Sequence, residues 1–379
     1  MSRLGLRWLA SRRDTCWTRA FPATDPLQLC IAGHTGQVGH ALLVHLQEKG
    51  LNRDSVRNWQ VAALVNSRLV QWPETSAPPE QREPGDWARI IARFKRHPGP
   101  KLFIDCSASE SVAAQYPVLL GHHIPIVTPN KLAFSASQRV YTTLQRLGRE
   151  NGAGLYYETT VGASLPILST VRDLLSSGDQ ITRIEACLSG TWSYVLNRLQ
   201  SGIAFSQAVR EAQERGYAEP NPVHDFSGSD VRRKLLILLR EIGLELEPSD
   251  VAGENPFPES TQAGNRPDNL MPWPTDWDAL WSERALEAAS QGQRLVFRAC
   301  FDGRQGRVAL ARVPVGSMLA ELAPGENRIC FWTRRYSMIP LSVAGPGAGP
   351  ELTAAGVLLD VIKAEAAQHR GAHLVQPGS

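Results

Sequence analysis

The sequence lacks the features that mark several classes of protein. It holds only six cysteines, widely spaced and without a C-x-x-C pair, so neither a zinc site nor a disulfide framework is indicated and a reducing cytoplasm is expected. No apolar run approaches the ~18 residues that a membrane-spanning helix needs, so no membrane partner is expected. The formal net charge is only +3 and the basic residues form no stripe, which argues against a nucleic-acid partner.

The overall composition is that of a globular chain large enough for two domains. Hydrophobic residues make up 42% and charged residues 20% of the 379 residues, and a chain of this length usually divides its core. Residues 1–26 are rich in arginine, with no acid before Asp14. This segment superficially resembles an organelle transit peptide, but a disordered basic tail is the prediction.

Strand and helix signals alternate over residues 27–153. The pattern predicts a doubly wound, Rossmann-type parallel sheet in an α/β dinucleotide-binding domain. A Pro-rich stretch at 71–87 reads as a surface loop. The predicted strands cover 27–32, 61–65, 101–106 and 124–128, and the predicted helices follow Gly39 and cover 86–96 and 111–121.

Residues 154–346 have a mixed pattern, which predicts an inserted α+β domain for substrate binding and dimerisation. A long irregular connection is predicted at residues 252–276. The first domain is predicted to be completed by residues 347–379, which form a glycine turn and a helix. The expected elements are a strand at 154–161, a helix at 165–175, a strand at 181–190, three helical stretches through Leu239, and a hairpin of 294–301 with 307–313 around Asp302-Gly303.

A glycine cluster, G-x-x-G-x-x-G, stands between the first predicted strand and helix. It reads Gly33-His34-Thr35-Gly36-Gln37-Val38-Gly39. Glycines there let backbone N–H groups approach a pyrophosphate at the positive end of a helix. A turn needed only for tight strand–helix packing is the alternative.

Two further predicted strand ends carry candidate cofactor contacts. The strand at 61–65 is followed by Asn66, Ser67 and Arg68 instead of an acid, which suits the 2′-phosphate of NADP(H) better than the ribose hydroxyl of NAD(H). Arg68 could equally be a solvated loop charge. The strand at 101–106 leads into Cys106 and small hydroxyl residues that could face a dinucleotide. A nucleophilic role for Cys106 is disfavoured, because no activating His accompanies it.

The chemistry-bearing residues concentrate in two segments. Lys131 follows the fourth predicted strand in a Thr-Pro-Asn-Lys sequence, where it could anchor a carboxylate, move a proton or simply be solvated. Asp230 and Lys234 stand four apart at the start of an apolar helix, so both project from one face. An ordinary helical ion pair is the alternative. The apolar run after Lys234 would place it in a partly desolvated site, where a lysine can act as an acid or base near neutrality.

With these residues assembled, the chain resembles the homoserine dehydrogenase family, especially the dehydrogenase half of bifunctional aspartate kinase–homoserine dehydrogenases. The likeness runs from about Leu29 to about Ile362. It rests on segments in the family order: VNSR, DCSAS, VTPNK, ETTVGASLPI, LSGTWSY, GYAEP, DFSGSDVRRKLLIL and GPGAGPELTAAGV. The resemblance implies an NAD(P)-dependent enzyme that interconverts L-homoserine and L-aspartate 4-semialdehyde, working as a homodimer in threonine and methionine biosynthesis.

The resemblance also implies residue roles. Lys234 would donate the proton, Asp230 would position it, and Lys131 would lie close to the same oxygen. The substrate-binding residues would be Glu219, Asp225, Tyr217, Gly190 and Thr191. The residues that would hold the dinucleotide are Gly33, Thr35, Gly36, Gln37, Val38, Ser107, Lys131, Gly347 and Gly349. The strand end at 66–68, and not the resemblance, predicts that NADP(H) is preferred over NAD(H), with Arg68 at the 2′-phosphate. A monovalent cation, sodium or potassium, would be bound by Glu158 and by the carbonyls of Val161, Ala163 and Leu165.

The sequence departs from the family in three respects. The glycine turn is one residue longer than usual, Asn221 stands where the family generally has Asp, and neither an aspartate kinase region nor a regulatory ACT domain is recognisable. The substitution at Asn221 motivates one alternative, a non-catalytic nucleotide-binding regulatory paralogue. The other is an aspartate-semialdehyde dehydrogenase, which requires a catalytic cysteine that neither Cys106 nor Cys187 matches in its surroundings.

Overall fold

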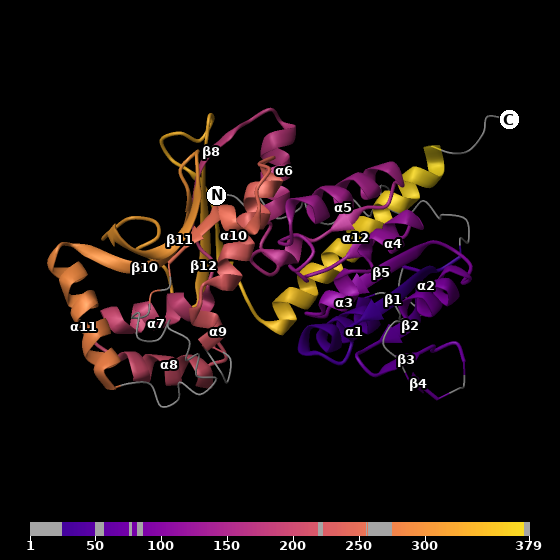
Figure 1. Cartoon of the computed structure of the whole chain (residues 1–379), viewed down its shortest axis with the longest axis horizontal. Helices are drawn as coiled ribbons and strands as arrows, with labels where there is room; N and C mark the ends of the chain where they lie inside the picture. The colour runs from indigo at the N-terminus through magenta and orange to yellow at the C-terminus, as the bar shows by residue number, and fades with distance from the viewer. Residues whose placement is uncertain are drawn as a thin grey trace, which may run out of the picture.

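Two β-sheets lie side by side along the long axis of the protein (Figure 1). The structure, a computed structural model, describes residues 25–49, 57–75, 78–81, 86–218, 223–254, 256 and 275–374. The predicted basic tail lies almost entirely outside these residues, as does most of the irregular connection predicted at 252–276. An α/β half is thus joined to a half built on a second, mixed sheet, which confirms the predicted fold class.

The first sheet is mostly parallel. In spatial order its seven strands are β4 (Glu80–Gln81), β3 (Leu69–Gln71), β2 (Trp59–Val65), β1 (Leu27–Ala32), β5 (Lys101–Asp105), β6 (Ile126–Val127) and β7 (Leu155–Tyr156). The strands from β2 to β7 in this order pair in parallel, and β3 and β4 add an antiparallel edge. The chain winds outward in opposite directions from β1 and β5, and sheets of this type bind ligands at the carboxyl ends of such strands.

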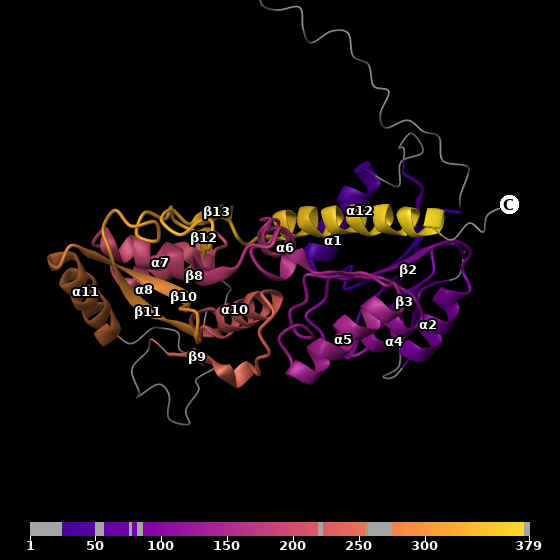
Figure 2. The same cartoon turned by 90° about the horizontal axis from the view of Figure 1, so that it is seen from above.

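Helices cover both faces of the first sheet (Figure 2). One face carries α1 (Gln37–Lys49) and α12 (Pro350–Leu374), and the other carries α2 (Trp87–Lys95), α4 (Tyr116–Gly121) and α5 (Gln138–Glu150). The buried residues Ala354, Val357 and Val361 of α12 share a core cluster with Leu42 of α1 and with β1. The end of the chain therefore returns to the first sheet.

The second sheet is mostly antiparallel. In spatial order it contains β13 (Leu341–Pro346), β12 (Glu326–Thr333), β8 (Ile181–Cys187), β10 (Gln293–Phe301), β11 (Gly306–Pro314) and β9 (Val251–Gly253). The helices of this half are α6 (Ile167–Ser176), α7 (Gly190–Gln200), α8 (Phe205–Glu214), α9 (Val223–Phe226), α10 (Ser229–Glu241) and α11 (Thr275–Ser290), with the 3-10 turn η2 at Pro248–Asp250. Trp192 of α7 packs against the rings of Phe226, Trp281 and Phe297. Helices α6 and α10 lie between the two sheets (Figures 1 and 2).

Several predicted elements are shorter than the sequence pattern suggests. The strand predicted at 154–161 is only the two residues of β7, which joins the first sheet, and the chain then turns into the 3-10 helix η1 (Glu158–Thr160). The helix predicted at 111–121 is divided into α3 (Glu110–Ala113) and α4. Pro117 in the first turn of α4 explains this break, because proline has no N–H and crowds the preceding helical turn. The predicted loop at 71–87 contains β4, a polar edge strand.

The packing of α1 against the sheet predicts unequal effects of two truncations on that helix. Leu42 is fully buried, whereas Val44 is 41% exposed. Leu42→Ala should lower the free energy of unfolding by about 2–5 kcal/mol, because it leaves a cavity in the core. Val44→Ala should change it by less than about 0.5 kcal/mol. Urea unfolding followed by circular dichroism measures both, and equal losses would contradict this account of the packing.

Candidate active site

The glycine turn connects β1 to α1 and lies against the end of β5. Gly33 has a φ of +79°, and a Cβ there would lie 2.7 Å from the backbone nitrogen of Ser107. A Cβ on Gly39 would lie 2.3 Å from the carbonyl oxygen of Gly33. Thr35, Gly36 and Gln37 are exposed, and α1 begins without an acid in its first turn. A close-packed turn with an uncovered helix N-terminus fits a pyrophosphate group.

The Gly347–Gly349 turn lies at the same edge of the first sheet. Farther along α12, Glu365 accepts a hydrogen bond from Trp59 at the start of β2, and Gln368 donates to the Lys101 carbonyl at the start of β5. The C-terminal part of α12 is therefore at the amino edge of the sheet, and its N-terminus points to the carboxyl edge. The helix N-termini of α1 and α12 consequently face the same ligand region.

Arg68 lies in the turn that follows β2. Asn66 stabilises this turn, because its Oδ1 accepts hydrogen bonds from the backbone N–H groups of Arg68 and Leu69, each at 2.8 Å. The Val65 carbonyl accepts from the N–H of Gly33 at 2.8 Å, so this turn is directly joined to the glycine turn. Arg68 is exposed, and a side chain of its length can reach the region beside the turn.

A buried carboxylate, Asp105, connects two loops at the carboxyl edge. Its Oδ1 accepts from the backbone and hydroxyl of Ser107 at 2.7 and 2.6 Å, and its Oδ2 accepts from Tyr116 at 2.7 Å and from the Asn130 amide at 3.0 Å. Its carbonyl accepts from the Thr128 hydroxyl at 2.8 Å. Burial raises the pKa of Asp105, and these hydrogen bonds oppose the rise. Ser107 and the loop that carries Lys131 are thereby held together.

Lys131, Asp230 and Lys234 meet between the two sheets. Asp230 Oδ2 lies 2.9 Å from Lys234 Nζ, and Asp230 Oδ1 lies 3.3 Å from Lys131 Nζ. Burial acts to raise the pKa of Asp230, but the two ammonium groups outweigh it and hold that pKa well below its ordinary value. Burial lowers the pKa of Lys131, an effect that Asp230 opposes. Helix α10 therefore contributes both members of the predicted helical pair to one cluster with Lys131.

Lys234 is also bonded to the turn that opens α7. Its Nζ donates to the Leu188 carbonyl at 2.8 Å, and only 8% of the residue is exposed. The next residues of this turn, Gly190 and Thr191, begin α7, and the Thr191 hydroxyl donates to the Tyr217 carbonyl at 2.6 Å. Gly190 and Thr191 thus follow within three residues the carbonyl that binds Lys234, and Thr191 in turn is bonded to Tyr217.

The remaining substrate residues are only partly covered by the structure. Tyr217 is 40% exposed and stacks on Tyr194 with the ring centroids 4.9 Å apart. Asp225 is half-buried on the short helix α9, one element before α10. Glu219 and Asn221 lie outside the described residues.

The segment predicted to bind a cation folds around two buried carboxylates. Both oxygens of Glu158 accept from the Ser169 backbone N–H, at 3.1 and 2.9 Å. Asp360 of α12 accepts from the Glu158 backbone N–H at 3.1 Å, and its Oδ1 is 3.4 Å from Lys363 Nζ. Burial raises the pKa of Asp360 to about 6, with Lys363 opposing and Glu158 adding to the rise. Ala163 has a φ of +53°.

Two buried carboxylates beside a single partly exposed ammonium group fit a monovalent cation. The Leu165 carbonyl, one of the predicted ligands, accepts from the Ile167 N–H at 2.8 Å. Among the residues that the structure describes, no group of three or more His, Cys, Asp or Glu could hold a metal ion.

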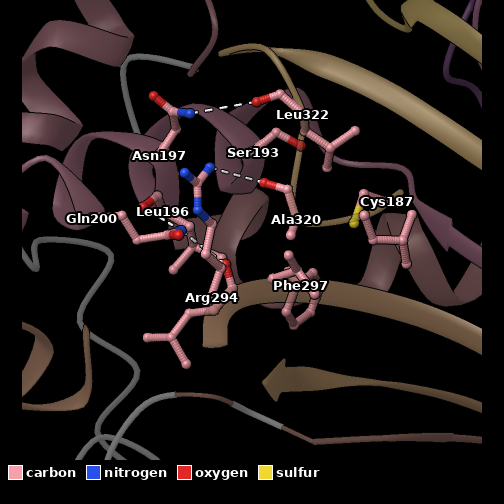
Figure 3. Close-up of a pocket in the computed structure, with 12 residues that line it drawn as sticks. Cys187, Ser193, Leu196, Asn197, Gln200, Arg294, Phe297, Ala320 and Leu322 are labelled. Carbon is pink, nitrogen blue, oxygen red and sulfur yellow. Dashed lines mark hydrogen bonds between the residues drawn. The ribbon is translucent and has the colours of Figure 1, made fainter. Parts of the chain in front are cut away.

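Two other features of the described residues take no part in the cluster of Lys131, Asp230 and Lys234. The small pocket in Figure 3 is lined by Asn197 and Gln200 of α7, Arg294 of β10 and Ala320. Burial raises the pKa of the Cys106 thiol, which disfavours a thiolate nucleophile.

Within the described part of the chain, no helix is long and apolar enough to cross a membrane.

Sequence reasoning missed several residues that organise the site. Asp105 stands inside the DCSAS segment, but nothing in the sequence says that its carboxylate is buried. Asp360 contacts a residue 202 positions earlier, so no local pattern could have indicated it. Leu188 contributes only its backbone carbonyl, which carries no side-chain signal.

Both halves of the chain are similar to known proteins. The family model described as "Homoserine dehydrogenase" matches residues 166–362, and that described as "Homoserine dehydrogenase, NAD binding domain" matches residues 35–158. The bifunctional aspartokinase/homoserine dehydrogenase 2, chloroplastic, of Zea mays is 40% identical over 91% of this chain and 39% of that protein. The homoserine dehydrogenase of Schizosaccharomyces pombe is 38% identical over 87% of this chain and 93% of that protein.

The chain spans about two fifths of the length of the bifunctional relatives it matches. Among solved structures, a Candida auris protein of unknown function has a TM-score of 0.80 at 29% identity, covering 90% of this chain and 99% of that one. A hyperthermophilic archaeal homoserine dehydrogenase in complex with NADPH has a TM-score of 0.67 at 23% identity, covering 90% and 98%. The latter likeness shows a shared fold.

The tight glycine turn predicts a steric difference between two of its glycines. Gly39→Ala should lower the free energy of unfolding by about 1–3 kcal/mol, because the new Cβ would overlap backbone atoms that cannot move aside. Gly36→Ala should cost less than about 1 kcal/mol, since its Cβ would lie 3.4 Å from the nearest atom, the Gly33 oxygen. Thermal unfolding of the ligand-free variants measures the difference. If Gly36→Ala were the more damaging variant, the packing described for this turn would be wrong.

Proposed function

Because the chain belongs to the homoserine dehydrogenase family, we propose that it interconverts L-homoserine and L-aspartate 4-semialdehyde, with NADP(H) as the preferred dinucleotide. The observation that carries the proposal is the cluster of Lys131, Asp230 and Lys234 at the junction of the two halves. Dinucleotide groups on the first half and substrate groups on the second would face each other there. Following NADPH formation with L-homoserine by absorbance tests it, and the absence of turnover would refute it.

In this proposal Lys234 handles the proton. When bound, a nicotinamide dinucleotide supplies or accepts the hydride. As the aldehyde carbon is reduced, Lys234 Nζ gives its proton to the carbonyl oxygen, and in the oxidative direction it takes that proton back. Asp230, 2.9 Å away, orients the ammonium group. Lys131 places a second positive charge beside the oxygen, where negative charge develops.

The other binding groups lie around this cluster. The dinucleotide would lie with its phosphates toward the helix N-termini of α1 and α12. The residues that would hold it are Gly33, Thr35, Gly36, Gln37, Val38, Ser107, Lys131, Gly347 and Gly349. Asp225 and Glu219 would pair with the substrate ammonium group, assisted by Tyr217, Gly190 and Thr191. Carbonyls of Val161, Ala163 and Leu165 with Glu158 would hold a sodium or potassium ion. The close approach of Gly33 to Ser107 supports a shared binding edge.

A homodimer and a cytoplasmic location are also proposed. Large hydrophobic side chains are exposed on turns of the second half, including Val315 at 55%, Met338 at 93% and Ile339 at 75%. Apolar side chains mark an association surface where they form one contiguous patch. The cytoplasm was inferred from widely spaced cysteines that suggest no disulfide framework, whereas the relatives from Zea mays are named as chloroplastic.

Replacement of the proposed proton donor is the sharpest test of the mechanism. Lys234→Ala should lower kcat by at least ~10²-fold, because general acid catalysis acts only in the transition state. The dissociation constant for NADPH, measured by fluorescence, should change little. Lys95→Ala, an exposed lysine on α2, is the matched control and should keep wild-type kcat. A Lys234→Ala enzyme that keeps more than about a tenth of kcat would contradict this role.

Arg68 is proposed to select NADP(H). A charge-assisted bond to a 2′-phosphate contributes ~1.5–3 kcal/mol, which corresponds to roughly ten- to a hundredfold in affinity. Arg68→Ala should therefore raise KM for NADP⁺ by about that factor and leave KM for NAD⁺ nearly unchanged. Arg96→Ala, which removes an exposed arginine beyond α2, controls for net charge. Equal losses with both dinucleotides, or a wild-type preference for NAD⁺, would rule out this role.

A further inference from the structure

Helix α10 carries two different polar groups along its length. Asp230 and Lys234 lie in its first half, in the cluster described above, and Arg240 and Glu241 are its last residues. From Lys234 to Arg240 the helix rises about 9 Å, at ~1.5 Å per residue. The helix lies between the two sheets (Figures 1 and 2), so contacts at its last turn can set where its first half is placed.

The guanidinium group of Arg240 is buried and binds backbone carbonyls. Only 3% of the residue is exposed, and the guanidinium donates to the carbonyls of Phe134, Ala136 and Leu246, each at 2.7 Å. It also lies 5.2 Å from the ring centroid of Tyr141. A planar fork can reach three carbonyls at once, whereas a lysine ammonium on a flexible stem cannot reproduce that geometry.

Two of these carbonyls belong to the turn that carries Lys131. The Lys131 carbonyl accepts from both the backbone N–H and the hydroxyl of Ser135, each at 2.9 Å. These bonds make 131–136 a closed turn, and Arg240 holds its far end. A displacement of Arg240 relative to Phe134 and Ala136 would consequently move Lys131 relative to α10.

Glu241 makes the adjoining contact. Its carboxylate accepts from the Tyr157 hydroxyl at 2.7 Å and from Arg172 Nε at 2.6 Å, and its side chain is only 9% exposed. The Tyr157 hydroxyl in turn accepts from Gln145 of α5 at 3.0 Å. Glu241 thus joins the end of α10 directly to Tyr157, which follows β7, and through Tyr157 to α5 of the first half.

We propose that Arg240 and Glu241, the α10 anchor, are positioning residues that set the separation of Lys131 from Asp230 and Lys234. The inference rests on the proposed function of that cluster. Neither residue touches the reacting groups; both act through the placement of α10 against the 131–136 turn. Because a misplacement of about 1 Å can lower turnover by up to ~10²-fold, loosening the anchor affects kcat more than ligand binding.

The first measurement compares turnover with binding in Arg240→Lys. The variant keeps the positive charge but loses the three-carbonyl geometry, so kcat should fall about tenfold or more. The dissociation constant for NADPH, measured by fluorescence in the full chain, should change less than about twofold, because the binding edge of the first sheet is untouched. A tenfold loss of NADPH affinity with unchanged kcat would overturn the proposal.

A double-mutant cycle with Lys131→Ala separates positioning from a general loss of stability. Once the Lys131 ammonium is removed, moving the turn that carried it has a smaller effect on kcat. The fold-loss in kcat of the double variant should therefore be at least about threefold smaller than the product of the two single fold-losses. Independent effects, in which the losses multiply, would overturn the proposal.

Three further variants make the result decisive. Arg294→Lys is the matched control, since Arg294 also donates to a carbonyl, that of Ala320 at 3.0 Å, away from the cluster (Figure 3). Ile90→Ala, which truncates a buried residue of α2, controls for lost stability. Both should keep wild-type kcat. If Arg240→Lys does not fold, Tyr157→Phe decides, because it removes only the hydroxyl, with its bonds to Glu241 and Gln145, and should lower kcat by about two- to tenfold.

The outcomes distinguish the two proposals. A wild-type enzyme that does not oxidise L-homoserine refutes the proposed function. An active wild type together with wild-type kcat in Arg240→Lys, or in Tyr157→Phe where the first variant is not folded, refutes the anchor alone.

Discussion

The candidate site depends on a carboxylate placed between two ammonium groups from different halves of the protein. Asp230 lies within 3.3 Å of both Lys131 and Lys234. Without Asp230, two positive charges at this spacing would repel each other, and each would lose stabilisation in a partly desolvated site. The ion cluster therefore forms only when the loop after β6 and the start of α10 are brought together, which couples the site directly to the packing of the two halves.

A second carboxylate, the buried Asp105, holds the loops at the carboxyl edge of the first sheet in place. Burying a charge is costly unless donors surround it, and Asp105 accepts from Ser107, Tyr116 and Asn130. Ser107 and Asn130 come from two loops at the carboxyl edge and Tyr116 comes from α4, so satisfying one buried charge also aligns those two loops. The glycine turn adds a steric constraint, because Gly33 leaves no room for a side chain beside Ser107.

Much of the fold could be predicted from hydrophobic periodicity and turn residues. The alternating elements, the hairpin at Asp302-Gly303 and the final glycine turn and helix are all present. The strand predicted at 154–161 was wrong beyond Tyr156, because apolar and β-branched residues there serve a turn that surrounds Glu158. Helix 111–121 was too long, although Pro117 was a visible signal for its break. A sequence pattern predicts only the local structural preference of a segment. Tertiary contacts override that preference where buried polar groups need hydrogen-bond partners.

The sequence by itself determined the class of sheet, the order of its motifs and the residue types that meet at the strand ends, because these follow from local periodicity and from spacing along one helix or turn. The pairing of Asp230 with Lys234 is of this local kind. Only the tertiary structure decided that Lys131 joins them, that Asp360 reaches Glu158 and that Arg240 binds the 131–136 turn. These contacts join residues about 100 or more positions apart, and the free energy that selects them comes from packing two halves together, which no local pattern encodes.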